Sequence, residues 1–156
     1  MAKECDNTSV GMLIRNDRGE LLLVERKLYP FGFAPPAGHV DDHGSFEKAA
    51  VDEIREEVGL TSGKLKLVAE GRKDNRCRRQ GGDWHYWKVY EVEAEGDLNP
   101  SSEETKRVDW FDGLRLKELA EKTKDYLAGK ISEEEWQKNP GLELVWLEWL
   151  AQLKIL

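Results

Sequence analysis

The order of hydrophobic and polar positions predicts strands first, one helix among them, and further helices last. The expected strands are residues 8–14, 20–24, 64–69, 84–94 and 107–111. The expected helices are residues 45–58, 114–128, 132–138 and 141–153. The strand at 84–94 alternates apolar and polar residues, as a strand with one wetter face does. Strands interrupted by one helix and followed by several are typical of an α+β fold.

The turns between these elements are marked by residues that favour them. Asn16-Asp17-Arg18-Gly19 separates the first two apolar runs, which predicts a β-hairpin because these residues adopt turn angles at low cost. Residues 29–38 (YPFGFAPPAG) are rich in proline and glycine, which indicates a shaped loop that leads into a short strand. Asn139-Pro140-Gly141 separates the last two helices.

The helix expected at 45–58 has its own start and stop signals. Ser45 is a suitable N-cap, and Gly59 stands where a left-handed residue commonly ends a helix. Val51, Ile54 and Val58 form an apolar stripe that we expect to be buried.

Another face of this helix carries acids. At about 100° per residue, Glu53, Glu56 and Glu57 fall within an arc of roughly 100°. If partly desolvated, each pair would repel by roughly 3 kcal/mol at about 5 Å and an effective dielectric near 20, unless a cation were bound. Clustered oxygens suit Mg²⁺ or Mn²⁺ and not zinc. A solvated helix face is the alternative for this spacing by itself.

Length and charge limit the class of protein. The 156 residues predict one domain over residues 1–156, with a C-terminal helical extension at about 114–156. The net charge of −7 argues against binding to nucleic-acid backbone. Phosphate substrates stay open, because a bound divalent cation can reverse the local charge.

The cysteines and the ends of the chain bear on its compartment. Cys5 and Cys77 show no metal-ligand spacing and no disulfide framework, so a reduced cytoplasmic setting is expected. The N-terminus has no apolar core of a signal peptide. The C-terminal apolar run is short and is broken by Glu143, Glu148 and Lys154, which predicts a packing helix and no membrane span.

Residues 38–60 (GHVDDHGSFEKAAVDEIREEVGL) closely resemble the Nudix box. The usual box is a glycine, five residues, a glutamate, seven residues, Arg-Glu, an aliphatic residue, any residue, Glu-Glu, any residue, a glycine and an aliphatic residue. The matching residues are Gly38, Glu53, Ile54, Glu56, Glu57, Gly59 and Leu60. The resemblance extends over about residues 8–118, including Leu-Val-Glu-Arg at 23–26 and Val-Asp-Trp-Phe at 108–111.

Two positions depart from the box. Gly44 stands where the family has a glutamate, and Asp52 stands where it has an arginine. In the family these two residues typically pair and brace the loop against the helix. Their joint replacement indicates the loss of one salt bridge with the metal glutamates kept, and a pair of this kind is worth about 0–1 kcal/mol when exposed. Asp52 itself could add a metal ligand or bind outer-shell water, with an exposed helix acid as the alternative.

The resemblance implies an α/β/α sandwich with a mixed sheet, the box helix on one side and the C-terminal helices on the other. It also implies Mg²⁺- or Mn²⁺-dependent hydrolysis of a pyrophosphate bond in a nucleoside diphosphate-linked compound, such as a nucleoside triphosphate. The implied metal ligands are Glu53, Glu56, Glu57 and the Gly38 carbonyl. The catalytic residues would be Glu53 and Glu57, and a carboxylate from the loop with Glu103 and Glu104 is an alternative general base.

Several further residues could contact the substrate or serve an ordinary structural role. Arg26 matches a strand-end arginine that touches phosphate in relatives, with a surface ion pair as the rival. Arg72 belongs to a basic loop, residues 72–79, that could guide an anionic substrate or simply be solvated. The aromatic residues that could stack a base or lie in the core are Phe33, Trp84, Trp87 and Trp110. The histidines, which show no ligand spacing, are His39, His43 and His85, and His39 is expected to be structural.

Two broader alternatives stay open at this point. Gly44 and Asp52 motivate a catalytically silent nucleotide-binding or regulatory module that keeps the fold. The helix with Trp146 and Trp149 could form a homodimer or partner surface, or it could cap the domain's own sheet. No substrate marker of the known subgroups follows the box, which favours nucleoside triphosphates or another small pyrophosphate.

Overall fold

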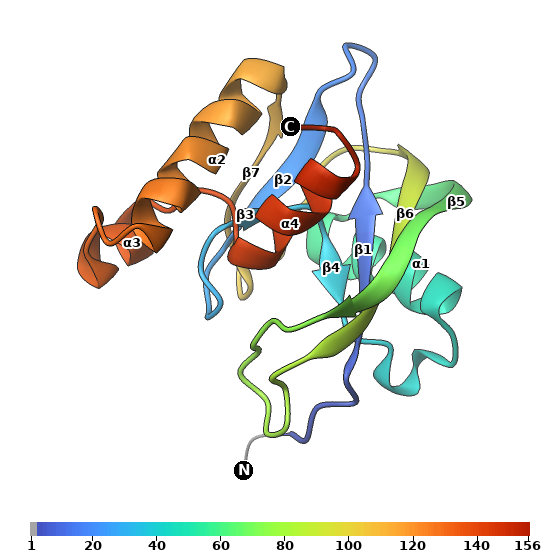
Figure 1. The fold of residues 1–156 in the computed structure, drawn as a ribbon. Coiled ribbons are helices and arrows are strands. Elements are labelled where there is room, and N and C mark those ends of the chain that lie inside the picture. The colour runs from blue at the N-terminus through green and yellow to red at the C-terminus, as the bar shows by residue number, and fades with distance from the viewer. Residues whose placement is uncertain (1–2) are drawn as a thin grey trace.

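The computed structural model describes residues 3–156 and confirms the α+β prediction (Figure 1). The strands are β1 (Thr8–Leu13), β2 (Leu21–Arg26), β3 (Phe33–Ala34), β4 (Ala37–Gly38), β5 (Thr61–Lys73), β6 (His85–Glu95) and β7 (Thr105–Phe111). The helices are the 3₁₀ helix η1 (Asp41–His43), α1 (Phe46–Val58), α2 (Gly113–Leu127), α3 (Glu133–Lys138) and α4 (Leu144–Gln152). Each predicted strand and helix is present, with bounds that differ most at β5.

The strands form two sheets with the orders β4-β1-β6-β5 and β3-β2-β7. Strands β1 and β6 run parallel, whereas the other pairs are antiparallel, so the mixed sheet is confirmed. The predicted hairpin is right for the turn, in which Gly19 N–H donates to Asn16 O at 2.9 Å, but wrong for the strands. After one bridge between Arg15 and Leu21 they enter different sheets, because β1 pairs with β4 and β6 while β2 pairs with β3 and β7.

Alternating side chains of β1 and β2 enter two cores on opposite faces of the strands. Met12 and Leu22 pack in the core that contains the apolar face of α1. Leu13, Leu21 and Leu23 pack in the core that contains α2 and α4. Both faces of these strands are therefore buried, and helices cover each side as the α/β/α prediction required (Figure 1).

Helix α4 caps the domain's own core. Trp146 and Trp149 are 0% and 1% exposed, and both rings meet Trp87 edge-on, with centroids 5.5 and 6.3 Å away. These two tryptophans are therefore core residues and do not form a partner surface. Among residues 3–156, neither α4 nor any other helix is long and apolar enough to cross a membrane.

Gly11 of β1 allows this packing, and its substitution tests it. A Cβ at this position would lie 2.4 Å from Trp146 Cη2, so Gly11→Ala should displace the indole and lower the free energy of unfolding by about 1–3 kcal/mol. Urea unfolding monitored by tryptophan fluorescence would measure the loss. Gly113→Ala is the matched control, because a Cβ there meets nothing within 4 Å. Equal stability of the two variants would contradict this packing.

Candidate active site

Helix α1 is held at both ends as the sequence predicts. The Ser45 hydroxyl accepts a hydrogen bond from Lys48 N–H at 3.0 Å, and Gly59 adopts φ 75° and donates to Arg55 O. A side chain at Gly59 would also meet Asn99, with Cβ atoms 2.7 Å apart. Ile54 is fully buried as predicted, whereas Val51, expected in the same stripe, is only half-buried.

The three box glutamates differ in exposure. The side chain of Glu53 is 18% exposed and Glu57 is 5% exposed, whereas Glu56 is exposed to solvent. A Cβ at Gly38 would lie 2.5 Å from Glu53 Cδ, so the first glycine of the box lets the strand approach that carboxylate. Glu57 accepts a hydrogen bond from Ala37 N–H at 3.3 Å.

The environment of Glu53 and Glu57 disfavours two negative charges. Burial, followed by the charges of Glu57, Glu56 and Glu104, raises the pKa of Glu53 to about 8. Burial also raises the pKa of Glu57 to about 8, against the opposing influence of Arg26 and the Ala37 N–H. Buried carboxylates that repel each other are stabilised by a bound divalent cation, and their oxygens fit Mg²⁺ or Mn²⁺.

A cleft brings many of the predicted site residues together. It is lined by Gly38, Glu53, Glu57, Arg26 and Glu104, all of which the sequence assigns to metal or substrate. Its other wall is the loop between β5 and β6, which contributes Asn75, Arg76, Cys77, Arg78 and Arg79. Acidic and basic side chains therefore share one cleft, a combination that suits a divalent cation together with an anionic ligand.

Three predicted substrate residues lie outside the lining of this cleft. Arg72 stacks on the Trp84 ring, 4.5 Å from its centroid, and pairs with Asp74 at 3.1 Å. Glu103 is exposed next to Glu104. Among the aromatic candidates, Phe33 and Trp87 are core residues, each 3% exposed, although Trp87 also reaches the cleft.

Glu143 is a cleft residue that the sequence interpretation missed. It is 7% exposed and precedes α4, where its N–H donates to Phe33 O at 2.9 Å. Burial raises its pKa, and the charge of Arg26 opposes that shift. Its only signal in the sequence is that it interrupts an apolar run, which we interpreted as an obstacle to membrane insertion.

Asp52 is not the exposed acid that the sequence allowed. It is 6% exposed, and its carboxylate accepts hydrogen bonds from His43 Nδ1 at 2.7 Å, Lys48 Nζ at 2.7 Å and Arg55 at 3.1 Å. The bonds from Lys48 and His43 hold its pKa far below the usual range. Three donors therefore occupy the oxygens of Asp52.

The pair of His43 and Asp52 joins the loop of the box to its helix. Gly44 adopts φ 96° directly after η1, a conformation in which the glutamate usual in the family would be strained. The pair of a loop glutamate and a helix arginine that the family pattern predicts is therefore replaced by His43 on the loop and Asp52 on α1. The interpretation that a salt bridge is simply lost is thus corrected.

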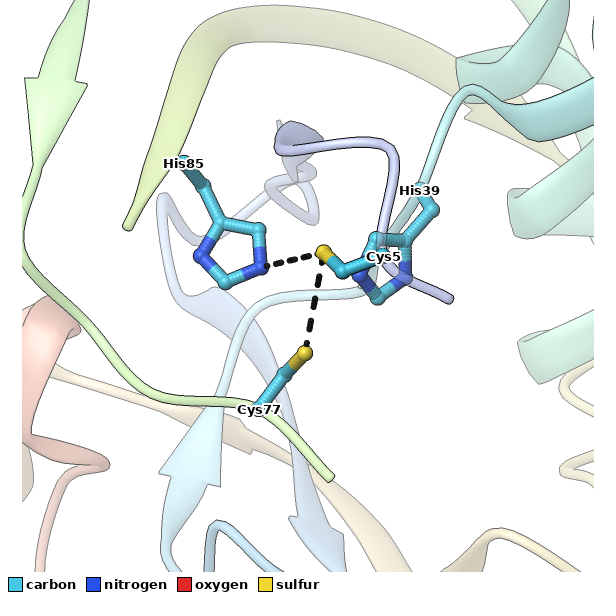
Figure 2. Close-up of side chains that lie close together, drawn as sticks. All are labelled: Cys5, His39, Cys77 and His85. Atoms are coloured by element: carbon cyan, nitrogen blue, oxygen red, sulfur yellow. Dashed lines mark hydrogen bonds between the residues drawn. The ribbon is translucent and has the colours of Figure 1, made fainter. Parts of the chain in front are cut away.

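The cysteines and two of the histidines also require a correction. Their sequence spacing shows no metal site, but the ligand atoms of Cys5, His39, Cys77 and His85 lie within 4.8 Å of one another (Figure 2). The four residues come from four separate segments, so spacing along the chain could not reveal the cluster. His39, Cys77 and His85 also line the cleft.

The raised pKa values predict a pH dependence of stability in the metal-free protein. Between about pH 6.5 and 8 the unfolded chain has lost the protons of Glu53 and Glu57, which ordinarily titrate at 4.5, while the folded chain retains them. The folded state binds more protons, so the free energy of unfolding should fall with rising pH, by on the order of 2 kcal/mol.

Urea unfolding at about pH 6.5 and at about pH 8, without and with Mg²⁺, measures this change in the free energy of unfolding. Mg²⁺ should remove most of the loss at pH 8, and Glu57→Gln should reduce the pH dependence without Mg²⁺. The depressed pKa of His39, about 4 against an ordinary 6.5, destabilises the fold as pH falls below about 7, so it opposes the carboxylate effect only slightly at pH 6.5. A metal-free protein equally stable at both pH values would show that the carboxylates are not buried together.

Comparisons with known proteins agree with this geometry. A sequence model of the NUDIX domain family matches residues 6–131. A MutT NUDIX hydrolase from Burkholderia pseudomallei is 24% identical, with a TM-score of 0.59, over 69% of this chain and 83% of that one. The dihydroneopterin triphosphate pyrophosphohydrolase of E. coli is 18% identical, with a TM-score of 0.60, over 72% and 84%.

A C. elegans Ap4A hydrolase is 22% identical, with a TM-score of 0.56, over 78% of this chain and 98% of that one. No curated protein matches the chain significantly. At these identities the solved structures show the fold, while the family match spans most of the chain and includes the box. The protein therefore belongs to the NUDIX domain family.

Proposed function

We propose that the protein hydrolyses a pyrophosphate bond in a nucleoside diphosphate-linked compound, such as a nucleoside triphosphate, with Mg²⁺ or Mn²⁺. The observation that carries this proposal is the pair Glu53 and Glu57, one half-buried and one buried carboxylate on one helix, which line a cleft together with Arg76 and Arg78. An anionic substrate and a divalent cation together would neutralise both walls of that cleft.

Four groups would hold the metal: the carboxylates of Glu53, Glu56 and Glu57 and the carbonyl of Gly38. When bound, the cation neutralises phosphate charge and makes a coordinated water more acidic. Glu56 is exposed, so a metal ion could reach its carboxylate from solvent. The carboxylate of Glu57 is held in place by the hydrogen bond from the Ala37 N–H.

The chain's own cations would bind the phosphates. Arg26 lines the cleft, and the bond from its Nε to Pro30 O, at 2.7 Å, fixes the side chain beside Glu57 and Glu143. Arg76 and Arg78 are exposed on the opposite wall, where they would attract an anion despite the net charge of −7.

A carboxylate of the cleft would accept the proton of the attacking water. Glu53, Glu57 and Glu104 are the candidates, because each lines the cleft. Glu104 is close enough for its charge to raise the pKa of both other groups, whereas Glu103 lies outside the lining. Of the two loop acids, Glu104 is therefore the better candidate.

A substrate panel tests the reaction directly. Nucleoside triphosphates, nucleotide sugars, a dinucleoside polyphosphate and dihydroneopterin triphosphate should be assayed for phosphate products with Mg²⁺ or Mn²⁺. The names of the E. coli and C. elegans proteins suggest the last two compounds. No turnover with any compound, together with no Mg²⁺ or Mn²⁺ binding by calorimetry, would favour the catalytically silent module instead.

Glu57→Gln tests the site once a substrate is found. The neutral amide removes one charge from the metal site, so turnover should fall at least about 100-fold while the fold stays intact. Unfolding of the metal-free variant should show equal or slightly greater stability, because the substitution relieves repulsion. Glu121→Gln, an exposed change on α2, is the matched control. Turnover near normal in Glu57→Gln would mean that the site is elsewhere.

A further inference from the structure

Two thiols and two imidazoles converge beside the cleft (Figure 2). Cys5 precedes β1, His39 follows β4, Cys77 lies in the loop between β5 and β6, and His85 begins β6. Cys5 Sγ is 3.8 Å from Cys77 Sγ and 3.3 Å from His85 Nε2. The ligand atoms of all four residues lie within 4.8 Å of one another.

The separations of Cys5 Sγ from Cys77 Sγ and from His85 Nε2 are close to two edges of a tetrahedral zinc site, and all four ligand atoms lie within 4.8 Å. With Zn–S near 2.3 Å and Zn–N near 2.0–2.1 Å, two sulfurs lie about 3.8 Å apart and a sulfur and a nitrogen about 3.5 Å apart. A disulfide would require the two sulfurs to be about 2.05 Å apart and would give the histidines no role. The observed spacing therefore fits a shared ion better than a bond between the cysteines.

One atom of the cluster lacks a partner. His39 Nε2 is buried and has no hydrogen-bond partner among the residues that the structure describes. A buried polar atom left in this way is unfavourable, and a metal ion at the centre of the cluster would remove that cost. The ring centroids of His39 and His85 are 5.4 Å apart, so the second imidazole adjoins the same space.

The surrounding hydrogen bonds orient the ligands. His85 Nδ1 lies 3.0 Å from Asn75 O, so its N–H donates a hydrogen bond to that carbonyl and Nε2 keeps a free lone pair that faces Cys5 Sγ. The backbone N–H of Asn7 donates to Cys5 Sγ at 3.3 Å, and that of Arg79 donates to Cys77 Sγ at 3.4 Å. Such donors stabilise thiolates, the form in which cysteine binds metal.

The backbone brings the two cysteines together at Gly82. A Cβ at this position would lie 2.2 Å from Cys77 Sγ and 3.4 Å from Cys5 Cβ, so a larger residue would displace the thiols. Cys77 N–H donates to Gly82 O, and Cys5 N–H donates to Gln80 O, both at 2.8 Å. The loop is therefore folded around the cluster and does not merely pass near it.

We propose that Cys5, His39, Cys77 and His85 bind one Zn²⁺ ion as a closed structural site, separate from the carboxylate site. The two thiols lose their protons to solvent on binding, which makes the complex electrically neutral. Sulfur and imidazole ligands select zinc over Mg²⁺, and four protein ligands leave no open position for a substrate. The ion would link the segment before β1 and the loop between β5 and β6 to the end of β4, the strand that contains Gly38.

Metal content and spectroscopy test the site in the full-length chain. After prolonged exchange against Mg²⁺, the protein purified under reducing conditions should retain about one zinc ion per chain. Replacement of zinc by Co²⁺ should give the visible bands of tetrahedral cobalt and a sulfur-to-cobalt charge-transfer band. Absence of the charge-transfer band in the wild-type protein would overturn the proposal, whether or not any variant folds.

Variants assign the ion to the cluster. Cys5→Ser and Cys77→Ser should lose zinc and the charge-transfer band, whereas His43→Asn, at the third histidine of the chain, should retain both. Glu57→Gln should also retain both, which separates this result from the proposed pyrophosphate hydrolysis. Zinc lost with Glu57→Gln but kept in the cysteine variants would overturn the proposal.

Thermal unfolding gives a readout that does not depend on activity. At a free zinc concentration about 1,000 times Kd, the wild-type midpoint should rise by roughly 8–16 °C over the zinc-free protein. Cys77→Ser should show no such rise, while His43→Asn should rise as the wild type does. Equal midpoints of the wild type with and without zinc would contradict a structural role.

Discussion

The active site depends on keeping two carboxyl groups close together and largely shielded from water on one helix. Ile54 and Val58 are 0% exposed and hold α1 in the core, so Glu57 cannot turn away to water without losing that packing. The carboxylates of Glu53 and Glu57 are thus kept in an arrangement that is unfavourable until a cation arrives. Apolar packing supplies the constraint that the proposed metal site would use.

The contact between the box loop and α1 is kept although its acidic and basic partners have exchanged places relative to the family pattern. Burying Asp52 is tolerable because His43, Lys48 and Arg55 surround its carboxylate. His43 also lies 3.6 Å from Glu53, which places the brace directly against the metal carboxylates. The departure from the family pattern is therefore a substitution of one local charge arrangement for another, and it weakens the case for a silent module.

The sequence predicted features that depend on local periodicity, and it failed where distant segments meet. The caps at Ser45 and Gly59, the acidic face of α1 and the order of strands all follow from neighbours within a few residues. The separation of β1 from β2 depends on which strands occupy their edges, and the role of Glu143 depends on where α4 begins. Neither is encoded in a nearby spacing, so neither could be derived without the fold.

Two adjacent residues connect the two proposed ion sites. Gly38 approaches the Glu53 carboxyl, while His39, the next residue, adjoins the cysteines on the other side of the strand end. Oxygen ligands on one side favour Mg²⁺, and sulfur with imidazole on the other favours zinc, so ligand chemistry keeps the ions from exchanging places. A zinc ion bound at His39 would fix the backbone of Gly38, whose carbonyl belongs to the proposed Mg²⁺ site. Rigidity of the catalytic cleft would then come from a second metal that takes no part in the reaction.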